Sequence, residues 1–225
     1  MLRHWRYHDL RRLLSRKMRM QYPVIRQLAD SDRWRLRPHF KALDATDRRL
    51  RFGITLDDAA IDRYVDLIDF DTEAVLGVAD SQANLIAVVH VAPVGEGAEL
   101  GLSVHQGARG AGLGGCLFAH AVAWARNRYL QRVFMHCLRE NQAILHLARR
   151  NGMSISMDGS DSSAVLLLQA PTFETLINEQ ATHWQAAAAD MRRLENRWFD
   201  WVLTGPQAAA KAFSESLQAR APGLR

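Results

Sequence analysis

The 225-residue sequence has only two cysteines, Cys116 and Cys137. Two cysteines in a chain of this length do not form a disulfide framework, and their spacing matches no set of metal ligands. We therefore expect a cytoplasmic protein without a metal, in which both thiols pack as small core residues. The sequence also has no apolar run near the roughly 18 residues of a membrane span. Its longest apolar stretch, residues 85–94, contains His90 and Pro93.

Acidic residues are scarce at the N-terminus. Residues 1–28 carry eight basic side chains and one acid, Asp9, although the whole chain is only +5. A surface built throughout for nucleic acid would be basic throughout, so the near-neutral body argues against that class. Residues 1–30 are instead predicted to form a basic amphipathic arm without the apolar segment of a secretory signal. The arm is expected to pack on the domain or a partner chain, in preference to nucleic acid or an anionic membrane.

Residues 34–169 have the pattern of one α/β domain. Residues 35–38 alternate like a short first strand, and residues 40–50 are predicted to form a helix. A second helix is expected to begin at Asp57-Asp58. The remaining elements are predicted as strands over 74–79, 85–91, 99–104, 133–138 and 165–168, and helices over 113–128 and 142–150. Strands and helices alternate only in the second half, which favours a mixed sheet flanked by helices.

A different pattern follows Pro171. From Ile177 to Trp201, residues that are apolar except for Gln180 recur at alternating steps of three and four, which predicts a long amphipathic helix over residues 171–204. Such a seam indicates pairing with the N-terminal helix or a homodimer. Residues 205–225 begin with Gly205-Pro206 and are predicted to form a flexible tail.

The most informative segment is a loop between the strand over 99–104 and the helix over 113–128. It has glycines at 110, 112, 114 and 115. Glycines allow a sharp turn and the close approach of a ligand, and a helix N-terminus offers unpaired N–H donors. Together they are typical of a pyrophosphate site. The loop is not a P-loop, because Gly114 is followed by Gly115-Cys116 with no lysine. It also fits a dinucleotide fingerprint poorly, because the acid expected about 20 residues on is matched only by Glu140, about 25 residues on, and the loop lies mid-chain.

This loop resembles the cofactor motif of the GNAT N-acetyltransferases, Arg/Gln-x-x-Gly-x-Gly/Ala, with matches at Arg109, Gly112 and Gly114. Residues 138–153 resemble the second conserved element of the same family. Asn141, Leu147 and Gly152 match it.

Two positions depart from that second element. Ala148 stands where many members have tyrosine, and Met153 where most have phenylalanine. Arg37-Pro38, the segment 40–52 and Glu99 are similar to the acetyltransferase domain of bacterial protein-lysine acetyltransferases, where the tyrosine is also commonly missing. The resemblance covers about residues 34–169.

The resemblance implies the GNAT fold, a central mixed and mostly antiparallel sheet flanked by helices, with acetyl-CoA as co-substrate. It implies that pantetheine lies along strand 99–104 and that the backbone N–H near Leu102 donates to the developing oxyanion. It also implies that Asn141 bonds pantetheine or a bridging water, and that small Ala148 leaves room beside the sulfur. The implied cofactor-binding residues are Leu102, Ser103, Val104, Arg109, Gly110, Ala111, Gly112, Leu113, Gly114, Gly115 and Asn141.

Acetyl transfer to an amine of pKa about 10.4 at neutral pH benefits from a base. Glu99, at the start of the strand that lines the site, is the first candidate, and Glu96 lies less favourably between two turn glycines. His90 and His136 fit better as hydrogen-bonded core residues. His146 is a further candidate for the acid in place of the missing tyrosine, although a thiolate can leave without a strong acid.

The predicted function is direct N-acetyl transfer from acetyl-CoA to a primary amine, either of a small molecule or of a protein lysine. The alternative is a non-catalytic acyl-CoA-binding module with regulatory or interaction roles, which the basic arm and Ala148 motivate. Residues 54–73 hold seven acids, which either attract a cationic acceptor or form a solvated helix face. We favour the solvated face.

Overall fold

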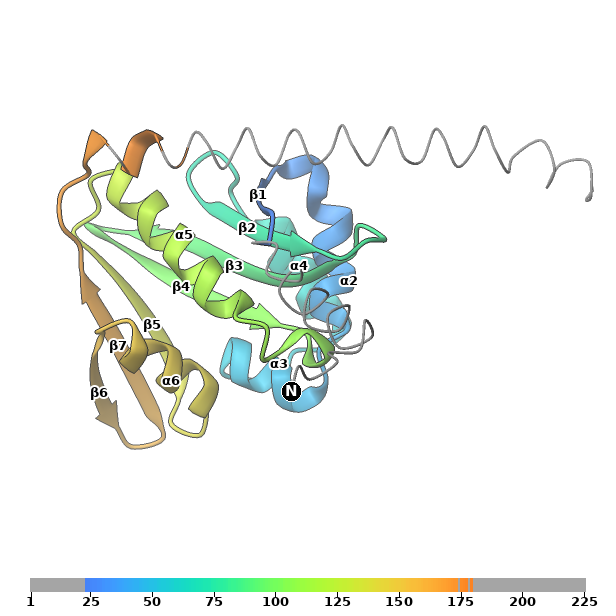
Figure 1. The fold of residues 1–225 in the computed structure, drawn as a ribbon. Coiled ribbons are helices and arrows are strands. Elements are labelled where there is room, and N and C mark those ends of the chain that lie inside the picture. The colour runs from blue at the N-terminus through green and yellow to red at the C-terminus, as the bar shows by residue number, and fades with distance from the viewer. Residues whose placement is uncertain (1–22, 174, 178, 180–225) are drawn as a thin grey trace, which may run out of the picture.

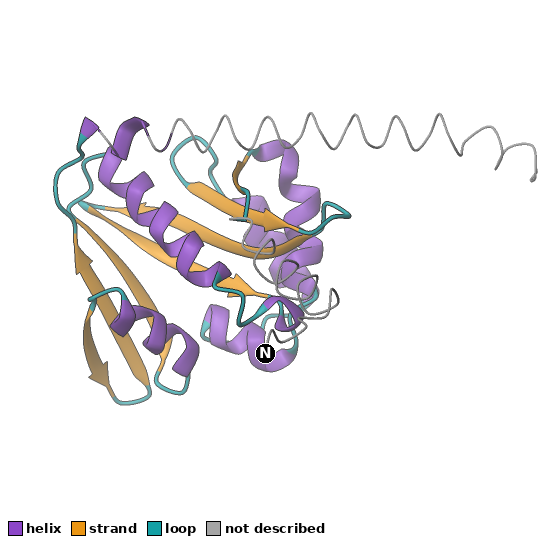
Figure 2. Ribbon diagram, in the orientation of Figure 1, coloured by secondary structure: helices purple, strands orange, loops and turns teal. Residues whose placement is uncertain are grey.

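A computed structural model describes residues 23–173, 175–177 and 179. Its strands form one sheet in the order β1-β2-β3-β4-β5-β7-β6 (Figures 1 and 2). All neighbours are antiparallel except β4 and β5, which are parallel. The strands are β1 (Ile25–Leu28), β2 (Ala74–Ala79), β3 (Leu85–Val94), β4 (Gly97–Val104), β5 (Arg132–Leu138), β6 (Ser154–Asp158) and β7 (Asp161–Leu167).

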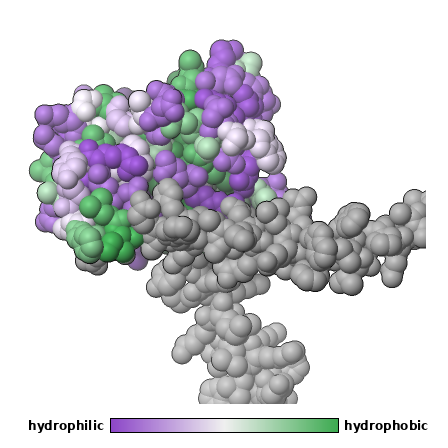
Figure 3. Space-filling view, turned by 90° about the horizontal axis from the view of Figure 1, so that it is seen from above, coloured by the Kyte–Doolittle hydropathy of each residue, from purple (hydrophilic) through white to green (hydrophobic). Residues whose placement is uncertain are grey.

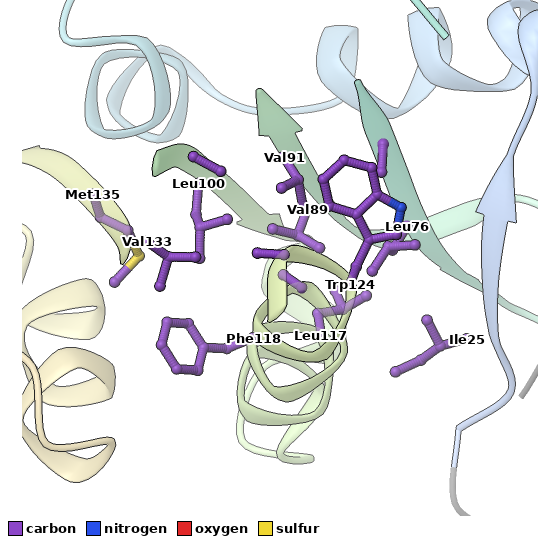
Figure 4. Packing of buried hydrophobic residues seen from close by; sticks show 14 of the residues in the cluster. Ile25, Leu76, Val89, Val91, Leu100, Leu117, Phe118, Trp124, Val133 and Met135 are labelled. Atoms are coloured by element: carbon purple, nitrogen blue, oxygen red, sulfur yellow. The ribbon is translucent and has the colours of Figure 1, made fainter. Parts of the chain in front are cut away.

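Helices cover both faces of this sheet. The helical elements are η1 (Asp30–Asp32), α2 (Arg33–Lys41), α3 (Ala45–Phe52), α4 (Asp58–Leu67), η2 (Gln106–Ala108), α5 (Leu113–Asn127) and α6 (Gln142–Arg150). One core lies under α5, where Leu117, Phe118 and Trp124 point toward Leu76, Val89, Val91, Leu100 and Val133 of the strands (Figure 4). A second core lies on the other face, between α2, α4 and strands β2 and β3. Hydrophilic side chains dominate the surface seen from above, interrupted by small hydrophobic patches (Figure 3).

Short polar signals set the ends of the helices beside the site. Asp44 and Asp57 cap α3 and α4, because each side chain accepts a hydrogen bond from the backbone N–H three residues on. Gly53 ends α3 in the left-handed conformation, with φ of 79°. These signals confirm the helix predicted at Asp57-Asp58.

Residues 35–38 were expected to form a strand, and that expectation is wrong because they lie inside α2. Leu36 and Phe40 are both fully buried, and their spacing of four residues is that of a helix face. The alternation over residues 35–37 is too short to distinguish a strand from a helix. The predicted helix over 40–50 is likewise two elements, the end of α2 and α3. Strands β1 and β6 were not predicted.

The mostly antiparallel mixed sheet flanked by helices agrees with the predicted fold class. Ile177, the first residue of the apolar seam, is 49% exposed. The basic arm was predicted over residues 1–30, and its residues 1–22, almost all of the predicted C-terminal helix and the tail lie outside the described residues. The end of the arm was assigned wrongly, because residues 25–28 pair with β2 as strand β1 of the domain. Within the described part, no helix is both long and apolar enough to cross a membrane.

Candidate active site

The centre of the sheet opens where β4 and β5 separate. The two strands pair only over Gly97–Glu99 and Arg132–Phe134. Beyond this point β4 continues to Val104 beside β3, and β5 continues to Leu138 beside β7. The edge of β4 after Glu99 therefore faces a widening gap with no strand paired to it, and this gap is the candidate cleft.

The glycine loop lies at the end of this open edge. Gly110 and Gly112 both have φ of 78°, a conformation that favours glycine, and a Cβ added at either would meet no atom within 4 Å. Gly112 precedes α5 without a side-chain cap, and the first turn of α5 has no acid. The helix therefore presents its first N–H groups to open space at its positive end, which suits a pyrophosphate.

Three predicted residues of β4 differ in their surroundings. Leu102 is half-buried and packs against the core under α5. The Ser103 side chain points to the other face, where its Oγ lies 2.8 Å from Nε2 of His39. The Val104 carbonyl accepts a hydrogen bond of 3.1 Å from Nε of Arg109. The side chain of Ser103 therefore serves the fold, and only its backbone is available to the cleft.

Arg109 is held from two sides. Besides Val104, its Nη2 donates to Oδ2 of Asp47 over 2.6 Å. Asp47 lies in the first turn of α3. The guanidinium thus ties the glycine loop to α3, and the loop offers a ligand its backbone.

Asn141 caps α6 and joins α6 to α3. Its Oδ1 accepts from the Ile144 N–H at 3.2 Å, and its Nδ2 donates to the Leu50 carbonyl at 3.2 Å. Arg49 pairs with Glu140 beside it. Helix α3 therefore contacts both walls of the cleft, the glycine loop through Asp47 and the β5 side through Arg49 and Leu50.

Ala148 lies in the core under α5 and is fully buried. His146, the candidate replacement acid, is exposed on α6. His136 on β5 is also exposed, contrary to the core position expected for it. Cys137 is buried, and burial raises the pKa of its thiol, with Asp161 adding to the effect.

Glu99 is the last residue of β4 that pairs with β5, opposite Phe134, and its side chain is exposed. It lies on the face covered by α2, α3 and α4, because Ala98 and Leu100 on either side point into the core under α5. Glu96 lies in the turn at the other end of β4, away from the glycine loop. Glu96 and Glu99 are three residues apart in the sequence, and Glu99 is the one that borders the open edge of β4.

A partly buried chain of polar side chains beside Glu99 was not predicted. Arg51 Nη2 donates to the Tyr64 hydroxyl at 2.8 Å, and this hydroxyl donates to Nδ1 of His90 at 2.8 Å. His90 Nε2 in turn donates to Oε2 of Glu73 at 2.8 Å. Burial lowers the pKa of His90 against the opposing effect of the Glu73 hydrogen bond, and burial raises the pKa of Tyr64. The direction of the His90 shift favours the neutral ring, to which this assignment of donors corresponds.

A pair of stacked histidines, His39 and His105, lies on the same face of the sheet. His39 Nδ1 donates to the Leu85 carbonyl at 2.9 Å, and its ring stacks on His105 at 4.4 Å. Burial lowers the pKa of His39 to about 3. These contacts fix α2 against β3 and β4.

Most of the seven acids between residues 54 and 73 have partners. Asp57 caps α4, Asp58 pairs with Arg48, and Asp62 and Asp66 pair with Arg37. Glu73 bonds His90. They do not form an uncompensated acidic surface, which agrees with the solvated helix face favoured above.

A cavity of about 330 Å³ opens beside the cleft wall formed by β5. It is lined by Arg49, Leu138, Arg139, Glu140 and Ser160. The cavity thus adjoins the contact between α3 and the start of α6. Among the described residues, no group of three or more His, Cys, Asp or Glu side chains is arranged to hold a metal ion.

Residues 32–153, more than half of the chain, match the family model described as "Acetyltransferase (GNAT) family". The chain therefore belongs to the GNAT acetyltransferase family. This range includes the glycine loop, Glu99 and α6. No curated protein sequence matches the chain.

Solved structures share the fold. The GNAT domain of S. lividans PAT aligns with a TM-score of 0.57 and 19% identity, covering 64% of this chain and 89% of that one. Spermidine N-acetyltransferase from Vibrio cholerae, solved with CoA and spermine, has a TM-score of 0.52 and 19% identity, with coverages of 64% and 94%. Phosphinothricin acetyltransferase from Sinorhizobium meliloti, solved with AcCoA, has a TM-score of 0.54 and 12% identity, with coverages of 67% and 94%. These identities show the fold alone.

Proposed function

We propose that the protein transfers an acetyl group from acetyl-CoA directly to a primary amine. The observation that carries the proposal is the glycine loop at the end of an unpaired strand edge. The open space at Gly110 and Gly112 and the uncapped start of α5 fit a pyrophosphate. The neighbours solved with CoA and AcCoA have the same fold, which supports the same co-substrate.

The thioester supplies an activated acetyl group and a thiol leaving group. Backbone N–H groups of residues 110–115 bind the pyrophosphate, and the open edge of β4 after Glu99 holds pantetheine. The N–H near Leu102 stabilises the negative charge that develops on the carbonyl oxygen; losing such a donor costs roughly 3 kcal/mol.

Glu99 takes a proton from the ammonium form of the acceptor, directly or through water. The amine nitrogen then bonds to the carbonyl carbon as the carbon–sulfur bond breaks. A free thiol has a pKa near 8.5, so the thiolate leaves without a strong acid, and Ala148 is compatible with turnover. The second proton passes from the acylated nitrogen to the thiolate, directly or through water, and Glu99 returns the first proton to solvent. The products are the N-acetyl amine and the free CoA thiol.

The acceptor is either a small-molecule amine or a protein lysine, as in the bacterial protein-lysine acetyltransferases that the sequence resembles. Thiol release from acetyl-CoA, followed with a panel of amines and lysine peptides, tests the activity. Binding of acetyl-CoA without any turnover would favour the acyl-CoA-binding module instead.

Gly112→Glu tests the cofactor site, because it adds strain and a negative charge where phosphate would lie. Gly95→Glu is the matched control: Gly95 also has positive φ and an open Cβ position, but it lies in the turn at the other end of β4. We expect Gly112→Glu to abolish both acetyl-CoA binding and turnover and Gly95→Glu to retain both. Turnover that survives Gly112→Glu contradicts the assignment.

A further inference from the structure

Arg51 is the only arginine of α2 and α3 without a carboxylate partner among the described residues. Arg33, Arg35, Arg37, Arg48 and Arg49 all pair with acids. Arg51 has one hydrogen bond, to the Tyr64 hydroxyl, and its buried Nε has no partner. Arg51 reaches the Glu73 carboxylate only through Tyr64 and His90, and a partly buried cation without a directly paired carboxylate favours the arrival of an anion.

The aromatic surroundings of Arg51 fix its guanidinium. The carbon of that group lies 4.8 Å from the Phe52 ring centre, 5.6 Å from that of Tyr64 and 5.7 Å from that of Phe40. These rings offset part of the cost of burial. They do not occupy the in-plane donors of the guanidinium, since π faces do not accept in that plane as a carboxylate does; Nη2 donates to Tyr64, and Nη1 can donate to an acceptor oxygen.

The guanidinium lies against Gly101 of β4. A Cβ at Gly101 would come within 2.3 Å of Nη2 and 2.4 Å of the guanidinium carbon. Gly101 is the second residue after Glu99 and lies beyond the last pair that β4 forms with β5. Arg51 therefore covers the start of the cleft, on the same face of the sheet as Glu99.

The positions of Arg51 and Glu99 along β4 suit one kind of molecule. Gly101, against which the Arg51 guanidinium lies, is two residues from Glu99, so the Cα atoms of Gly101 and Glu99 are about 7 Å apart. In an α-amino acid, about 2.5 Å separates the amine nitrogen from the carboxyl carbon. Such a molecule can put its amine at Glu99 and its carboxylate at Arg51 at the same time.

We propose that the amine acceptor carries a carboxylate next to its amine, as a free α-amino acid does, and that Arg51 binds this carboxylate. The inference rests on the proposed acetyl transfer and names its substrate class. It disfavours polyamines, whose second positive charge would approach the guanidinium. It also disfavours the side-chain amine of a peptide lysine, which has no neighbouring carboxylate.

The test is the acceptor preference of the full chain. Free L-amino acids are assayed by thiol release, and each active one is compared with its carboxamide and with the amine that lacks the carboxyl group. We expect kcat/KM for the acid to exceed that for the carboxamide by at least about tenfold, the size of a charge-assisted hydrogen bond. Arg51→Gln is expected to reduce this ratio toward one, chiefly through the acceptor KM, with the acetyl-CoA KM unchanged.

Two further variants separate recognition from folding. Arg51→Lys keeps the charge and is expected to keep part of the preference. Gly101→Ala leaves Arg51 in the sequence but displaces its guanidinium, so it is expected to lower the same ratio. Arg63→Gln is the control, because Arg63 is exposed on α4 next to Tyr64 and has no ion-pair partner among the described residues.

The outcomes distinguish this inference from the proposed function. Turnover of simple amines or lysine peptides with no preference for acids overturns the inference and leaves acetyl transfer standing. A preference for acids that survives Arg51→Gln also overturns it. So does an Arg51→Gln variant in which only the KM for acetyl-CoA changes. If no amine is acetylated, the proposed function fails, and calorimetric titration of amino acids and their carboxamides into the CoA-loaded chain still decides whether Arg51 selects a carboxylate.

Discussion

The hydroxyl of Tyr64 lies 2.8 Å from Nδ1 of His90 and joins a helix to the central sheet. The same hydroxyl accepts from Arg51, so one oxygen satisfies two buried groups. His90 Nε2 in turn donates to Glu73, so the hydrogen bonds run in one direction, from Arg51 through Tyr64 and His90 to the Glu73 carboxylate.

Tyr64→Phe is expected to destabilise the fold, because it leaves donors and acceptors of Arg51 and His90 unmatched. The expected loss is roughly 1–3 kcal/mol in the free energy of unfolding, measured by urea denaturation. Tyr129→Phe is the control, since Tyr129 is 77% exposed. Equal stability of the two variants would mean that the Tyr64 hydrogen bonds contribute nothing net.

His39 makes stability depend on pH. Burial lowers its pKa to about 3, whereas the unfolded chain binds a proton near pH 6.5. A lowered pKa in the folded state gives a contribution that is complete above pH 6.5 and is lost as pH falls toward 3. The slope from this group is about 1.4 kcal/mol per pH unit at most.

His39→Gln removes that titration, so the difference in stability between the natural chain and the variant should shrink as the solution is acidified from pH 6.5 to 4.5. Urea denaturation at each pH measures it. A difference that stays constant with pH would show that the folded and unfolded chains protonate His39 alike, so that burial does not lower its pKa.

Glu99→Gln is expected to lower kcat/KM at pH 7 by at least about 10²-fold, the usual contribution of a general base. The deficit should narrow as pH approaches the pKa of the acceptor amine used in the assay, about 10.4 for a lysine-type amine and lower for an α-amine, because the amine then loses its proton to solvent. Glu96→Gln, in the turn before β4, provides the comparison and should retain its rate. A Glu99→Gln enzyme with full activity at every pH would assign the base elsewhere.

Asn141 has two separable roles. Asn141→Asp keeps an oxygen for the Ile144 N–H but loses the donor to the Leu50 carbonyl, whereas Asn141→Ala loses both. Loss of a cap costs about 1 kcal/mol, so we expect the Ala variant to be less stable than the Asp variant by that amount. If their thermal unfolding curves coincide, the cap contributes no stability.

The sequence was informative wherever a local pattern determines the structure. Strand β2 and helix α6 have the predicted bounds, and the glycine loop lies between β4 and α5 as expected. Such features depend on residues close in the chain: alternation, a polar cap and glycines before an apolar helix.

Contacts between distant segments were not predictable in this way. Arg51 contacts Gly101, 50 positions away, and the His90 ring meets Glu73 and Tyr64 from two other elements. No spacing rule joins these residues. Strand β1 was missed because its four residues form an edge strand too short to establish a period.

The three-residue pairing between β4 and β5 also bears on the order of folding. Strands β1 to β4 are neighbours in space, and β2 to β4 follow one another through short turns, as do β6 and β7. Contacts between segments near in sequence form fastest, whereas β4 and β5 meet only after α5 has crossed between them. We expect the junction, and with it the candidate cleft, to be completed late, so substitutions there should accelerate unfolding more than they slow refolding.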